Sequence, residues 1–151
     1  MHGALNMKIK QLCHRSAGFS LIELMIVVVI VAILAAIAVP SYTSYMLDSR
    51  RVDGVSFLTE VAGEQIRFFS ENNRFATTMA ELGYGGDATA NSDEGFYTLS
   101  ITTSNANQAY VLRATPVAGG PQAKDTECAV LTLNSSKQKT VSGTATPADC
   151  W

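Results

Sequence analysis

The most pronounced pattern in the chain is a long apolar run near its N-terminus. Every residue from 21 to 39 is apolar except Glu23, and the run ends at Pro40. As an α-helix rising 1.5 Å per residue, this run would extend about 28 Å, close to the ~30 Å hydrocarbon thickness of a bilayer. The pattern therefore predicts a helix that can span a membrane.

Basic residues lie only on the N-terminal flank of this run. Lys8, Lys10 and Arg15 precede it, and no basic residue follows until Arg50. Because positively charged flanks stay on the cytoplasmic side, we expect the N-terminus inside and the remainder of the chain exported.

Glu23 bears on which kind of membrane segment this run forms. Residues 36–38 (Ala-Ile-Ala) fit a secretory cleavage pattern, so a cleaved signal peptide and a plain single-pass anchor are both alternatives. A carboxylate costs about 2.5 to 3.5 kcal/mol at mid-membrane, less near an interface, and a signal peptide gains nothing from it. A lipoprotein signal is excluded because Cys13 precedes the run.

A second periodic pattern follows Pro40. Apolar residues recur at steps of three, four or seven, which predicts an amphipathic helix through about residue 71 with its stripe in the core. Gly54 and Gly63 weaken this helix by up to ~1 kcal/mol each. The expected core stripe consists of Tyr45, Val52, Val55, Leu58, Ala62, Ile66 and Phe69.

Beyond the helix, the chain changes to polar turns and alternating segments. Residues 72–95 are rich in Asn, Thr, Gly and Asp and predict a connecting loop with one helical turn near 78–82. Alternation predicts strands at 96–102, 108–115, 128–133 and 138–141, with weak strand potential in 142–151. We therefore expect an α+β domain in which one long helix packs on an antiparallel sheet of about four strands.

The cysteines and histidines limit which reactions and metal sites the chain can support. Cys128 and Cys150 fall in the exported part and most simply form one disulfide, stabilising by about 3 kcal/mol; two free thiols are the alternative. His2 and His14 both precede the apolar run, and no nucleophile elbow or phosphate-binding glycine loop is present. We expect a protein that is not an enzyme and holds no cofactor or metal.

Charge argues against a general nucleic-acid surface. The formal net charge is -2, and from Phe19 onward eight basic and thirteen acidic side chains give -5. Nonspecific DNA affinity depends on Lys and Arg neutralising phosphates. Four C-terminal cations would still make a DNA-contact stripe if the fold gathered them: Arg113, Lys124, Lys137 and Lys139.

The N-terminal residues carry a family resemblance. Residues 18–25 (Gly-Phe-Ser-Leu-Ile-Glu-Leu-Met), with a basic leader before them and Val39-Pro40-Ser41-Tyr42 ending the apolar run, resemble the class III signal of type IV pilins. The resemblance implies that prepilin peptidase cuts between Gly18 and Phe19 and that the Phe19 amine is then methylated. The leader would comprise residues 1–18, or start at Met7.

The resemblance also implies roles for the helix. Glu23 would meet the Phe19 amine of a neighbouring subunit, and Pro40 would kink the helix or mark where it melts during assembly. The pilus machinery would then move the subunit from the inner membrane into an extracellular filament of pilins. Residues 19–39 would form the membrane and assembly half of the helix, 40–71 its amphipathic half, and 96–151 the sheet and disulfide-closed region.

The C-terminal residues resemble one subgroup of this family. Residues 128–133 (Cys-Ala-Val-Leu-Thr-Leu) and the ending Asp149-Cys150-Trp151 resemble minor pilins related to the DNA-receptor pilins of natural competence. The leading hypothesis is a structural subunit, a minor pilin. A pilus-displayed DNA-uptake receptor and a type II secretion pseudopilin are the alternatives, and adhesion, twitching motility and DNA uptake all stay open as roles of the pilus.

Overall fold

The computed structural model describes residues 18–151. The chain divides between Val39 and Pro40 into two units, which are described separately, and helix α1 (Leu21–Asn72) has residues in both. The expectations for Lys8, Lys10, Arg15, Cys13, the two histidines and the alternative start at Met7 fall outside the described residues.

The first unit contributes the apolar part of α1. Its helix is long and apolar enough to cross a membrane, and the most apolar stretch has none of its residues buried. Glu23 lies in the first helical turn. This part of the helix therefore presents an uncovered apolar surface on all sides.

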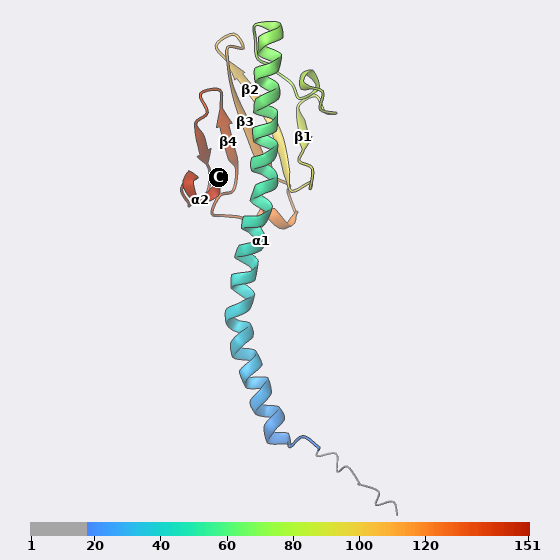
Figure 1. Ribbon diagram of the computed structural model, residues 1–151, viewed down its shortest axis with the longest axis vertical. Coiled ribbons are helices and arrows are strands. Elements are labelled where there is room, and N and C mark those ends of the chain that lie inside the picture. Colours follow the sequence, from blue (N-terminus) through green and yellow to red (C-terminus); the bar gives the residue numbers. More distant parts are fainter. Residues whose placement is uncertain (1–17) are drawn as a thin grey trace, which may run out of the picture. The chain divides into compact units, whose positions relative to one another are not determined.

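In the second unit, the remaining part of α1 lies across one face of an antiparallel sheet (Figure 1). The five strands follow one another in the order β1-β2-β3-β4-β5. They are β1 (Thr89–Asn91), β2 (Tyr97–Ser104), β3 (Ala109–Pro116), β4 (Leu131–Asn134) and β5 (Lys139–Val141). Three short helices lie in the connections and the tail: η1 (Ala80–Leu82), η2 (Pro121–Lys124) and α2 (Pro147–Cys150).

The core forms between the helix and the sheet, as the predicted α+β class requires. Leu58 and Val61 of α1 are fully buried, and so are Tyr97, Leu99 and Leu112 of the strands. In β2 and β3, alternate side chains are buried, because successive residues of a strand point to opposite faces. The predicted alternation of these two strands is confirmed.

The sheet has five strands, where the sequence predicted about four. The additional strand, β1, lies within the segment 72–95 that we expected to be a connection with one helical turn. That turn is present as η1, but β1 carries no apolar alternation that would indicate a strand. β1 is a strand because it pairs with β2. In this pairing, Thr89 faces Ser100 and Asn91 faces Thr98.

The predicted core stripe of the helix is correct in part. Leu58 is fully buried and Val55 and Ala62 pack against the core, but Tyr45, Val52 and Ile66 are 69%, 63% and 58% exposed. The buried positions of α1 are Arg51, Gly54, Phe57, Leu58, Val61 and Gln65. Arg51 and Gln65 are buried because specific partners satisfy their polar atoms, which apolar periodicity does not register.

The C-terminal region departs from its prediction in two places. The third predicted strand begins at Leu131 instead of Cys128, because the Cys128 amide donates to the Asp125 carboxylate and Ala129 adopts a left-handed φ of 49°. The tail ends in helix α2 instead of extended structure. Thr146 and Asp149 form a capping box at the start of this helix, which satisfies its first amide donors.

Candidate functional site

The start of α1 carries the residues expected to be processed. Gly18 and Phe19 lie before the first helical residue, and both are exposed. The Leu24 amide donates to the Ser20 carbonyl at 3.1 Å, which closes the first turn after them. The bond between Gly18 and Phe19 thus lies outside the helical hydrogen bonds, where another protein can reach it.

Glu23 is the acidic residue of this first turn. A negative charge there is favoured by the helix macrodipole, which places partial positive charge at the N-terminus. Large apolar side chains surround it, and those of Ile22, Leu24 and Ile26 are 62%, 60% and 54% exposed. An apolar surface of this kind marks a site of contact with a membrane or with other proteins.

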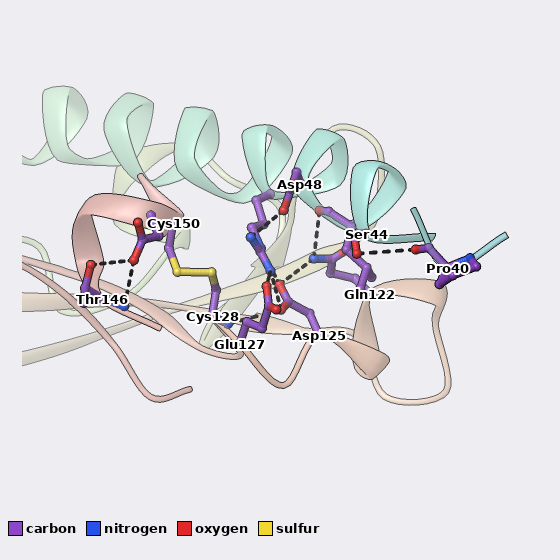
Figure 2. Close-up of polar contacts among 12 residues, drawn as sticks. Pro40, Ser44, Asp48, Gln122, Asp125, Glu127, Cys128, Thr146 and Cys150 are labelled. Carbon is purple, nitrogen blue, oxygen red and sulfur yellow. Dashed lines mark hydrogen bonds and ion pairs between the residues drawn. A yellow bond between two sulfur atoms is a disulfide. The ribbon is translucent and has the colours of Figure 1, made fainter. Parts of the chain in front are cut away.

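Pro40 lies inside α1 and has no backbone N–H to donate. The Thr43 hydroxyl donates to the Pro40 carbonyl at 2.8 Å. The Ser44 hydroxyl approaches the same oxygen at 3.5 Å, as Figure 2 shows. Hydroxyls that bond to main-chain carbonyls compete with the helical hydrogen bonds. The backbone hydrogen bonding of the helix is therefore weakened around Pro40.

A buried ion cluster attaches the second part of α1 to the segment after η2. Arg51 donates from Nε and Nη2 to the two carboxylate oxygens of Asp125, at 2.7 and 2.8 Å. Asp48 accepts a hydrogen bond from Arg51 Nη1 at 2.6 Å, and Glu127 accepts one from Arg51 Nη2 at 3.1 Å. Figure 2 shows Asp48 on the helix and Asp125 and Glu127 on the facing segment, directed toward one another.

The ionisation of this cluster follows from its contacts. Burial alone would raise the pKa of Asp125, but the Arg51 guanidinium and backbone N–H donors outweigh it and leave that pKa lowered. Hydrogen bonding to Asp125 raises the pKa of Arg51 further above its ordinary value. Both groups stay charged and mutually satisfied, so the cluster is a structural clamp.

A disulfide lies beside this clamp. Cys128 and Cys150 are joined, with their Cα atoms 5.8 Å apart, and both are buried. The bridge links the segment before β4 to helix α2 (Figure 2). The clamp and the bridge together fix the C-terminal segment against α1.

Ion pairs divide the basic residues of the described chain into two groups. Arg51, Arg67 and Arg74 pair with carboxylates. Within residues 18–151, the others form no ion pair: Arg50, Arg113, Lys124, Lys137 and Lys139. Four of these five are the predicted DNA-contact residues, and Arg50 is the one that the sequence analysis did not single out.

The fold does not gather the four predicted cations into one stripe. Arg113 of β3 is exposed on the sheet face opposite the buried residues Leu112 and Ala114. Lys139 is paired with the buried Leu133, so it lies on the other face, where its Nζ is 4.9 Å from the Trp151 ring centroid. Lys137 lies in the β4–β5 turn and Lys124 at the end of η2.

The outer sheet face around Arg113 is rich in hydroxyl groups. The register aligns one residue from each strand in a row: Thr89, Ser100, Arg113, Thr132 and Thr140. None of the five described strands contains an acidic residue. The acidic excess of the chain therefore lies on the helix and the loops, a separation that net charge along the sequence does not reveal.

No group of three or more His, Cys, Asp or Glu side chains in the described part of the chain has the spacing to hold a metal ion.

The fold and the N-terminal segment each match a known class of protein. The prokaryotic N-terminal methylation motif matches residues 13–39. A solved type IV pilin from Shewanella oneidensis resembles 70% of this chain and 97% of its own chain, with a TM-score of 0.51 and 22% identity, a likeness that concerns the fold. The fold is therefore that of a type IV pilin.

A more specific match covers the second unit. The family model described as "Type IV minor pilin ComP, DNA uptake sequence receptor" matches residues 40–132, more than half of the chain. The chain belongs to this family of type IV minor pilins.

A curated relative agrees with this class. The type IV major pilin protein PilA of Myxococcus xanthus (strain DK1622) is 38% identical over 78 residues. That alignment spans 52% of this chain and 36% of PilA, so the chain covers only about a third of that relative's length.

Proposed function

We propose that this protein is a structural subunit, a minor pilin, of a type IV pilus. It is inserted in the inner membrane as a precursor with its N-terminus in the cytoplasm, and its second unit is exported. Prepilin peptidase cuts between Gly18 and Phe19, the Phe19 amine is methylated, and the pilus machinery assembles the mature chain with other pilins into an extracellular filament.

The observation that carries this proposal is the uncovered apolar surface of α1 with a single carboxylate in its first turn. Lipid covers such a surface before assembly, and neighbouring helices cover it afterwards. Within the packed helices, Glu23 pairs with the ammonium group of Phe19 on a neighbouring subunit, because an unpaired charge in an apolar environment is costly. The pairing sets the register of the subunits. Pro40 and its hydroxyl neighbours give the helix a place to yield during this transfer.

Intact mass of the mature protein tests the processing step. We expect a chain that begins at Phe19 and carries one added methyl group. A mass that corresponds to cleavage after Ala38, or to no cleavage, contradicts the proposal.

A Glu23→Ala variant tests the assembly step. We expect less of this variant in sheared pili and an unchanged amount in the membrane fraction. Glu71→Ala is the matched control, because Glu71 is an exposed carboxylate on the same helix. Normal incorporation of the Glu23→Ala variant into pili would contradict the proposed role of this carboxylate.

DNA binding is the second candidate function, and two observations favour it. The matching family is described as a DNA uptake sequence receptor, and the strands of the exposed sheet face carry Arg113 without any carboxylate. We propose that Arg113 is the main contact to DNA phosphate, and that Lys124, Lys137 and Lys139 make further contacts. No enzymatic step is part of either proposal.

Salt-dependent DNA binding by the detergent-solubilised full chain tests this function. We expect Arg113→Gln to weaken binding and to reduce the slope of log K against log salt by about 0.9, the value for one phosphate contact. Arg67→Gln is the control, because Arg67 is already paired with Glu64 on the helix. An equal loss in both variants rejects the sheet face, and no binding at low salt rejects the function.

A further inference from the structure

A cavity of about 430 Å³ lies between the first turns of the second unit's helix and the short helix η2. Tyr42, Met46 and Arg50 line it from α1, and Pro121 and Lys124 line it from η2. Tyr42, Met46 and Arg50 are spaced by four residues, so they follow one face of the helix. The cavity has an apolar wall with two cations on it, and its volume lies in the range of small-ligand sites.

Neither cation of this cavity is paired with a carboxylate of the described residues, although Arg50 also borders a neighbouring pocket that Asp53, Asp93 and Glu94 line. Neither Arg50 nor Lys124 forms an ion pair within residues 18–151, and no carboxylate is among the residues that line the cavity. The Arg50 Nε is buried and has no acceptor among the described residues, while its guanidinium carbon lies 5.3 Å from the Phe96 ring centroid. The next residue, Arg51, bonds to three carboxylates. Within the described chain, the fold therefore leaves Arg50 without an ion pair and with an unused Nε donor.

The cavity begins close to the apolar run along the chain. Tyr42 follows Val39, the last residue of the run, by three positions. Three residues span at most about 11 Å even when fully extended, so this limit holds at any angle between the two units. Tyr42 and Tyr45 are 65% and 69% exposed, and tyrosines with one wet and one apolar end are enriched at membrane–water interfaces.

We propose that this cavity binds the phosphate of an anionic phospholipid headgroup, taken from the outer leaflet of the membrane in which α1 is anchored. The planar guanidinium of Arg50 suits a phosphate through two parallel hydrogen bonds, and Lys124 adds a point charge from the opposite wall. Met46 and Pro121 contact the glycerol and the first acyl carbons. This inference rests on the membrane-anchored precursor of the proposed function, and it adds a lipid partner that holds the exported unit at the bilayer.

Native mass spectrometry of the detergent-solubilised full chain tests the proposal, with short-chain phosphatidylglycerol and phosphatidylcholine as probes. We expect tighter binding of phosphatidylglycerol. Arg50→Gln and Lys124→Gln should each weaken it about fivefold, the change that corresponds to about 1 kcal/mol for each basic residue at an anionic membrane surface. Arg113→Gln and Lys137→Gln remove the same charge outside the cavity and should leave the preference unchanged.

Three results would overturn the assignment: equal binding of the two lipids, an unchanged preference in Arg50→Gln/Lys124→Gln, or an equal loss in the two control variants. Inorganic phosphate and double-stranded DNA are added as competitors. Inorganic phosphate that displaces the lipid at equal concentration makes the cavity a free-phosphate site. DNA binding that only the cavity variants lose makes it part of the DNA surface. The assay needs no pilus, so its failure leaves the pilin proposal standing, whereas failure of the Glu23→Ala test leaves lipid binding untouched.

Discussion

Arg51 and Asp125 lie 74 positions apart in the chain and meet in the interior through two hydrogen bonds of 2.7 and 2.8 Å. The Asp125 side chain is fully buried, and Arg51 also holds the more exposed Asp48 and Glu127. Asp125 further accepts the Cys128 amide at 3.1 Å. This one pair therefore positions the helix, the η2 segment and the disulfide relative to one another.

Replacing Asp125 by Asn should destabilise the second unit by about 3 to 5 kcal/mol, because it leaves the Arg51 charge buried without its principal partner. Asp48→Asn removes a carboxylate whose side chain is 60% exposed and should cost about 1 kcal/mol or less. Urea unfolding of the full chain in detergent, followed by fluorescence of the single tryptophan Trp151, measures both. Equal losses in the two variants would contradict the clamp.

Two glycines of α1 should respond in opposite directions to alanine. A Cβ on Gly54 would lie 2.8 Å from Cδ2 of Tyr97, so Gly54→Ala overpacks the core and should cost about 1 to 3 kcal/mol. A Cβ on Gly63 meets no atom within 4 Å, and Gly63→Ala should stabilise by up to about 1 kcal/mol through helix propensity. The same urea titration compares them, and a loss of stability in Gly63→Ala would count against this account of the helix.

Loss of the Cys128–Cys150 bridge should lower stability by about 3 kcal/mol, the chain-entropy estimate for a loop with a sequence separation of 22. Cys150→Ser and reduction of the wild-type chain should give the same loss. Thermal unfolding by circular dichroism with and without reductant measures it. Cys13→Ser, which leaves the bridge intact, should keep its sensitivity to reductant.

Stability should also depend on pH through Glu81. Hydrogen bonds from Arg74 and then from the Thr77 amide hold the pKa of Glu81 at about 2, below its ordinary value of 4.5. A lowered folded-state pKa contributes stability that is fully present above about pH 4.5 and is lost as the pH falls toward 2. Glu81→Gln should therefore destabilise at pH 6 and have little effect at pH 2.

Urea unfolding at pH 6 and at pH 2 measures this difference in the stability of the Glu81→Gln variant. Glu71→Gln provides the comparison, because Glu71 is exposed on the preceding helix. A Glu81→Gln variant that loses equal stability at both pH values would show that its ionisation plays no part.

Much of the fold was predictable because local patterns specify it. The apolar run, the strand alternation at Tyr97, Leu99, Tyr110 and Leu112, and the class of helix on antiparallel sheet all follow from residue periodicity. The disulfide followed from two cysteines in the part of the chain that was expected to be exported. The predicted roles of Gly18, Phe19, Glu23 and Pro40 concern processing and assembly, and they remain predictions.

The rest depends on partners distant in sequence. Arg51 and Gln65 occupy the core face of α1 because Asp125 and the backbone of Ala76 satisfy them, and neither partner is visible in helical periodicity. Strand β1 exists through its pairing with β2. Arg50 and Lys124 line one cavity only because the chain folds η2 back toward α1. Lys139 and Arg113 lie on opposite faces of the sheet.

The two outermost strands, β1 and β5, have only three residues each. Each therefore offers few unpaired backbone donors and acceptors along the border of the sheet, and such borders are where separate chains join by β-pairing. In a fibre, subunits are held together at very high local concentration. In the proposed filament, a sheet with such short borders would resist joining its neighbours by β-pairing, so the contact between subunits would be left to the helices.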